Sequence, residues 1–247
     1  MTTRLRVSSH LIAAALTTLT GAAAVTDTGP RFIGKTGDLR RFKLTQALKF
    51  QDQDLNVSAD VNEKVVRVDD AGLVTVQYVT LNIKAKLGAQ DLPVKDSPPL
   101  TAVYRPDGAL SELRGENASP TQYRLETLTS VKLPLFALAA DKTWTWDISP
   151  NVKLGIQKSS ITYKVLGEET VAGVAAWKVS RAIKELEGDR PASSDGTVWI
   201  GKLDGMPIKQ VDTWVNAPIP GAPFTVSGTF TLELQPSGST TSAGQGA

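Results

Sequence analysis

The sequence contains no cysteine and a single histidine, His10. His10 lies in an N-terminal stretch, residues 1–24, that we interpret as a secretory signal peptide. Cleavage after Ala24 would leave a chain without either residue. This excludes disulfides, thiol redox chemistry, Ser-His-Asp or Cys-His catalysis and His-ligated metals, so we expect no cofactor and no metal site. The absence of cysteine also excludes a lipid-anchored lipoprotein.

The signal-peptide interpretation depends on three features of the first 24 residues. Arg4 and Arg6 form a positively charged start, residues 11–19 are apolar, and three small residues end at Ala24. This pattern predicts a periplasmic or secreted protein whose mature chain begins near Val25. A retained membrane anchor is the alternative, although the apolar run is shorter than the ~20 residues that span a bilayer.

The chain also lacks a charge excess. It has 27 Lys and Arg against 25 Asp and Glu, and Arg4 and Arg6 would leave with the signal peptide. A neutral chain without a basic stripe is a poor partner for phosphates, so we expect no nucleic-acid partner. No later segment is long and apolar enough to predict an integral membrane span, and we expect a monomer.

Hydrophobic residues make up 41% and charged residues 21% of the chain, which is typical of a globular protein. Between residues 38 and 235 apolar residues alternate with polar ones, which indicates an antiparallel meander of about nine or ten strands in one domain. The sequence Asp-Asp-Ala-Gly at 69–72 predicts a hairpin turn. Residues 25–37 are expected to be a linker, and the Ser- and Gly-rich segment 236–247 a disordered tail.

One segment interrupts the strand pattern. Ser119 suits a helix N-cap, Pro120 the first helical position, and Gln122 the third position of a capping box. Leu125 and Leu128 then follow at helical spacing. A strand is the alternative, because apolar residues also alternate here.

Two local patterns suggest enzymes, and we interpret neither as catalytic. Residues 29–36 match the phosphate-loop pattern G-x-x-x-x-G-K-[ST], which binds phosphate only between a strand and a helix. Here a signal peptide precedes the match and a strand pattern follows it, so we interpret it as coincidence. The acidic pairs at 69–70 and 168–169 fit solvated turns. An enzyme could only be a carboxylate-based hydrolase, and this is our third hypothesis.

The second half of the chain carries a set of strand-and-turn motifs. Segments 165–173, 176–179, 198–201 and 204–209 read VLGEETVAG, AWKV, VWIG and DGMPIK. This pattern resembles the lipoprotein-carrier superfamily of exported bacterial proteins, which includes LolA-, LolB- and LppX-like carriers. The resemblance covers about residues 160–234. It implies a strongly curved antiparallel sheet, an unclosed half-barrel, with a helix packed on its concave side. Some members hold lipid or acyl chains there, and the resemblance brings no catalytic residues.

These observations together predict a mainly β protein whose half-barrel wraps one helix within residues 120–139. The predicted function is non-enzymatic binding of an apolar ligand, either a lipid or the acyl chain of a lipoprotein or other acylated partner, in the cell envelope. The alternative is an envelope interaction module with a packed core. Candidate ligand-binding residues are those on the apolar side of the helix and of the segment after it: Leu125, Leu128, Leu133, Leu135 and Phe136.

Overall fold

The computed structural model describes residues 29–50, 52–222 and 224–236. The predicted signal peptide lies outside these residues, as does the predicted tail except for Pro236. Within the described ranges, no helix has the length and apolar character needed to cross a membrane.

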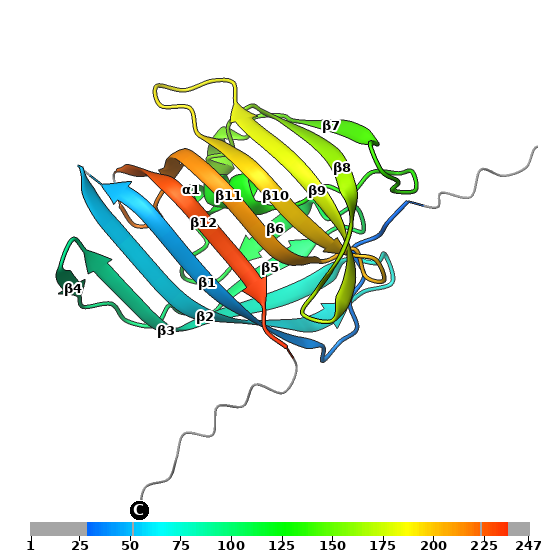
Figure 1. Ribbon diagram of the computed structural model, residues 1–247, viewed down its shortest axis with the longest axis horizontal. Helices are drawn as coiled ribbons and strands as arrows, with labels where there is room; N and C mark the ends of the chain where they lie inside the picture. Colours follow the sequence, from blue (N-terminus) through cyan, green and yellow to red (C-terminus); the bar gives the residue numbers. More distant parts are fainter. Residues whose placement is uncertain (1–28, 51, 223, 237–247) are drawn as a thin grey trace, which may run out of the picture.

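The described residues form one antiparallel sheet of twelve strands (Figure 1). The strand order is β6-β5-β3-β2-β1-β12-β11-β10-β9-β8-β7, with β4 paired to β3. The predicted fold class is confirmed: the protein is mainly β, with a single antiparallel sheet that is not closed. It has more strands than the nine or ten expected. Their bounds are β1 (Leu39–Phe50), β2 (Gln53–Val68), β3 (Val74–Leu87), β4 (Gln90–Leu92), β5 (Leu100–Tyr104), β6 (Leu110–Arg114), β7 (Thr143–Ile148), β8 (Ser159–Val171), β9 (Val174–Glu185), β10 (Ser193–Gly201), β11 (Pro207–Pro218) and β12 (Thr225–Leu234).

Long hairpins set the register of this sheet. Strands β1 and β2 pair along the whole of β1, from Leu39 opposite Lys64 to Phe50 opposite Gln53. The predicted turn between β2 and β3 is confirmed, because the Asp69 carboxylate accepts hydrogen bonds from two backbone N–H groups of the turn. Side chains alternate between the two faces of each strand, so this register gathers the apolar residues on one concave face.

The sheet curves around the one α-helix of the described residues. Register shifts interrupt the β2–β3, β8–β9, β10–β11 and β11–β12 pairings, and such bulges bend and twist strands. In Figure 1, β1, β12 and β11 lie in front of the helix and of β5 and β6. The helix also covers the β6 edge. Its Tyr123 hydroxyl accepts a hydrogen bond from the Leu113 N–H at 2.8 Å and donates one to the Leu113 carbonyl at 3.4 Å.

The helix α1 spans Pro120–Thr129 and packs against β11. The predicted cap is confirmed, because the Ser119 hydroxyl accepts a hydrogen bond from the Gln122 N–H at 3.2 Å. The predicted region 120–139 is too long for the helix, which gives way to extended backbone at Ser130. Carbonyls at this end bond to Arg181 from a distant strand, so a tertiary contact stabilises the termination.

The described part of the predicted linker, residues 29–37, is packed onto the domain. Phe32 is only 6% exposed, and its ring centroid lies 4.9 Å from that of Tyr104. The Phe32 N–H donates to the Pro106 carbonyl, and the Ile33 N–H donates to the Asp204 carbonyl. This segment therefore belongs to the domain instead of forming a free linker. The phosphate-loop match within it leads into β1 and not into a helix, so the helix N-terminus that the motif requires is missing.

The interior has two different halves. Beside β7–β10, the concave face is filled by a packed core around Leu128, Ile161, Tyr163, Val179 and Ile183, none of them measurably exposed. Beside β1, β2, β3 and β5, the same face leaves an open space. The residues that line this space define the candidate functional site.

Candidate ligand-binding cavity

A cavity of about 320 Å³ lies between α1 and the concave face of strands β1, β2, β3, β5, β11 and β12. Its size falls within the range of about 300–1,000 Å³ that is usual for small-molecule sites. Its lining is mostly apolar and includes Phe42 and Leu44 from β1, Phe230 and Leu232 from β12, and Leu125 from the helix. The space can therefore bury an apolar group of a ligand.

The strand register explains why these side chains converge. Phe42 and Leu44 are alternate residues of β1 and therefore point to the same face. Leu44 lies opposite Leu232 on β12, and the next inward residue of β1, Gln46, lies opposite Phe230. Ser97 and Pro98, from the loop between β4 and β5, also line the cavity. The part of β3 between its pairings with β4 and β5, residues 79–84, pairs with neither of these strands.

One polar pair in the lining is Arg40 and Glu63, which face each other across β1 and β2. The Arg40 Nε donates to Glu63 Oε1 at 2.8 Å, a second guanidinium nitrogen contacts the same oxygen, and the third donates to the Pro207 carbonyl. The two side chains are only 15% and 8% exposed. Burial raises the pKa of Glu63, and the Arg40 charge opposes this effect. The charges of the pair neutralise each other inside the protein.

Two tyrosines add hydroxyls close to this pair. The Tyr78 and Tyr104 oxygens lie 3.1 Å apart, and both residues line the cavity. Burial is the main reason why the pKa of each phenol lies well above its ordinary value. At neutral pH both groups are therefore uncharged.

Glu126 is the second carboxyl group of the lining, and α1 positions it. The Gln122 side-chain amide, one turn earlier, donates to Glu126 Oε1 at 3.0 Å. Burial raises the pKa of Glu126, and the neutral Gln122 and Thr129 side chains oppose the shift. Among the described residues, no lysine or arginine forms a salt bridge with it. Glu126 thus differs from Glu63, which has a cation beside it.

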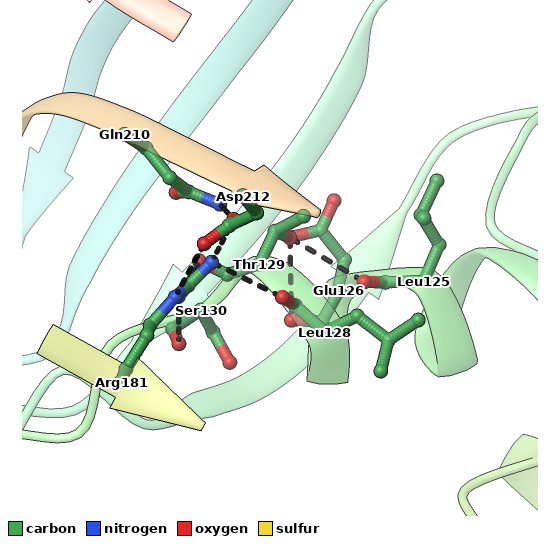
Figure 2. Close-up of polar contacts among 8 residues, drawn as sticks. All are labelled: Leu125, Glu126, Leu128, Thr129, Ser130, Arg181, Gln210 and Asp212. Carbon is green, nitrogen blue, oxygen red and sulfur yellow. Dashed lines mark hydrogen bonds and ion pairs between the residues drawn. The ribbon is translucent and has the colours of Figure 1, made fainter. Parts of the chain in front are cut away.

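A buried ion pair holds the helix against the sheet (Figure 2). Arg181 on β9 and Asp212 on β11 bond at 3.2 Å (Nε to Oδ1) and 2.5 Å (Nη2 to Oδ2), and both side chains are completely buried. The strand between them contributes Gly196, which pairs with both residues. A β-carbon at Gly196 would lie 2.1 Å from the Val211 carbonyl oxygen and 2.3 Å from Asp212 Oδ1. Only glycine leaves room for the arginine to reach across β10.

The same guanidinium group binds the C-terminal end of α1. It donates hydrogen bonds of 2.9–3.1 Å to the carbonyls of Leu128, Thr129 and Ser130, as Figure 2 shows. Helix C-termini leave such carbonyls unpaired and carry partial negative charge, so a cation there is favourable. Thr129 and Ser130 also line the cavity, as does Gln210, whose amide donates to Asp212. The network therefore fixes one wall of the cavity.

The structure separates the five candidate residues predicted from the sequence. Of these, Leu125 lines the cavity, whereas Leu128 and Leu133 are buried in the packed core. Leu135 is 75% exposed and Phe136 is 39% exposed. The helix ends at Thr129, so the apolar residues that follow do not continue its inward face.

Two residues that shape the candidate site were missed in the sequence. Arg181 lies between Val179 and Ile183 on β9, and Asp212 lies between Gln210 and Trp214 on β11. Each is a charged residue at an inward position of an alternating strand. This placement was the available signal, since a charge in a buried row requires a partner.

Comparison with known proteins leaves the resemblance untested. No protein-family model matches the chain, and no curated protein is significantly similar to it. Membership of the lipoprotein-carrier superfamily therefore stays a prediction from the motifs. In the part of the chain that the structure describes, no three His, Cys, Asp or Glu side chains gather in a group that could hold a metal ion.

Proposed function

We propose that this protein binds an apolar ligand, a lipid or the acyl chain of an acylated partner, without catalysing a reaction. The observation that carries the proposal is the apolar cavity between α1 and the sheet. Each methylene that moves from water into such a space contributes ~0.8 kcal/mol. We also propose that residues 1–24 direct export of the chain, so that the ligand is met outside the cytoplasm.

The construction of the walls supports a ligand site. The sheet side is a hydrogen-bonded ladder, and the helix side is held by Arg181, so the cavity exists without a ligand to prop it open. A preformed site avoids part of the ordering cost of binding. The concave face beside β7–β10 is filled, and thus a ligand would bind beside β1, β2, β3, β5, β11 and β12.

The test measures binding of the neutral fluorescent probe N-phenyl-1-naphthylamine, together with extraction of lipid that co-purifies with the protein. Leu44→Trp places a large ring in the cavity and should abolish probe binding. Thr45→Trp is the matched control, because the next residue of β1 is exposed on the opposite face and its variant should bind as the wild type does. Thermal unfolding of both variants verifies the fold. A wild-type protein that binds no probe and carries no lipid refutes the proposal and leaves the interaction-module hypothesis.

A further inference from the structure

The charged groups of the cavity are unevenly paired. The lining contains one cation, Arg40, and two carboxyl groups, Glu63 and Glu126. Glu63 and Arg40 form a salt bridge, whereas Glu126 has only neutral hydrogen-bonding neighbours. The lining has no positive charge left over for a ligand.

Arg40 is already paired within the protein. All three of its guanidinium nitrogens have partners in Glu63 or the Pro207 carbonyl, and Phe42 lies beneath it with 5.3 Å between the guanidinium carbon and the ring centroid. A ligand carboxylate that took the place of Glu63 on Arg40 would leave the Glu63 carboxyl group buried without a cation. Breaking a buried pair in this way is strongly unfavourable.

Glu126, in contrast, has capacity to accept from a ligand. Among the described residues, its carboxyl group has two hydrogen-bonding neighbours, Gln122, which donates to Oε1, and the Thr129 hydroxyl. A carboxylate offers about four acceptor positions on its two oxygens. A ligand hydroxyl near Glu126 would gain a hydrogen bond, whereas a ligand carboxylate would be repelled by the like charge of the ionised Glu126.

We infer that the cavity selects amphiphiles whose polar end is an uncharged hydroxyl, such as a fatty alcohol or a monoacylglycerol, and rejects free fatty acids. The inference rests on the proposed function and names the ligand class of the same site. Glu126 provides the acceptor for the hydroxyl, and the Arg40–Glu63 pair prevents capture of a carboxylate.

The experiment compares ligands of equal chain length below their micellar concentrations. Displacement of N-phenyl-1-naphthylamine from the purified protein is measured at neutral pH with 1-decanol, monodecanoylglycerol and decanoate. We expect the two hydroxyl compounds to displace the probe at concentrations at least ten-fold lower than decanoate. Equal or tighter binding of decanoate overturns the inference while the proposed function stands. Absence of any probe binding overturns both.

Two variants test the residues that carry the selection. Glu126→Gln should weaken decanol binding several-fold, because an amide oxygen is a weaker acceptor, and should strengthen decanoate binding. The control is Glu187→Gln, because the Glu187 carboxylate is exposed and lies outside the cavity lining. This variant should bind decanol and decanoate as the wild type does. An unchanged decanol-to-decanoate ratio in Glu126→Gln contradicts the inference.

Two further variants test the Arg40–Glu63 pair. Glu63→Gln should free Arg40 and raise the affinity for decanoate at least ten-fold, whereas the double variant Arg40→Met with Glu63→Leu should show no gain. An increase in decanoate affinity in both variants contradicts the role proposed for the Arg40–Glu63 pair. The same holds if neither variant shows an increase while both remain folded. If Glu63→Gln does not fold, the decanol-to-decanoate ratio of Glu126→Gln decides the inference.

Discussion

Replacing Asp212 by asparagine tests the buried ion pair that secures the helix. The side chain keeps its shape but loses its charge, and its amide N–H₂ faces donors, since Arg181 and Gln210 both donate to the carboxylate. Arg181 would then be a buried cation without a counter-charge. Both side chains are 0% exposed, so the full cost for breaking a buried pair, about 3–5 kcal/mol, applies to the free energy of unfolding.

Urea unfolding of the purified protein, followed by tryptophan fluorescence, measures this loss. The control is Asp54→Asn, which breaks the Lys49–Asp54 pair on the surface, where both side chains are 63% exposed. An exposed pair contributes only about 0–1 kcal/mol, so the control should unfold at nearly the wild-type urea concentration.

A double variant separates the charge from the rest of the site. Arg181→Met with Asp212→Leu removes both charges, and apolar side chains often replace a buried pair with little loss. It should be more stable than Asp212→Asn, although three helix carbonyls lose their donor. The reasoning is refuted if Asp212→Asn costs no more than Asp54→Asn.

Three further predictions follow from the same structure. Leu128→Ala should lower the free energy of unfolding by about 2–5 kcal/mol, since Leu128 is fully buried in the packed core; Leu125→Ala should weaken probe binding more than it lowers stability, and the opposite order contradicts the division of the interior. The raised pKa of Glu126 means that the folded state retains a proton that the unfolded state loses above the ordinary value of 4.5, so this group makes stability fall as pH rises through that window. The stability of Glu126→Gln relative to wild type should therefore increase from pH 4 to pH 7, and a constant difference in urea titrations argues against the shift. The intact mass of the exported protein should correspond to a chain beginning within a few residues of Val25, and a mass that retains residues 1–24 refutes cleavage.

Features that depend on neighbouring residues were predictable. The alternation of apolar and polar residues in β1 to β3 is visible in the sequence itself. The turn after Val68 and the Ser119 cap depend on hydrogen bonds between residues a few positions apart. Helix capping and strand alternation are local effects, and their physical causes are visible in the residues themselves. The mainly β class with one helix was therefore predicted correctly, and the unclosed sheet agrees with what the family resemblance implied.

Features that depend on residues distant in the sequence were not predictable. The end of α1 at Thr129 depends on Arg181, an arginine more than fifty positions away. Residues 29–37 belong to the domain because the Phe32 ring packs against the Tyr104 ring. The sequence also could not show that Leu125 faces a cavity while Leu128, three residues later, faces a packed core. Both positions are apolar, and the choice depends on which strands lie opposite.

The sequence by itself determined the strand alternation, the turn after Val68 and the start of the helix, because their periods and caps require no knowledge of the rest of the chain. Tertiary structure alone decided where the cavity lies and what charge it presents. Arg40 is neutralised because the β1–β2 register places Glu63 across from it, and Arg181 reaches Asp212 because Gly196 intervenes without a side chain. Such pairings arise from strand register, which brings together residues that no local pattern connects.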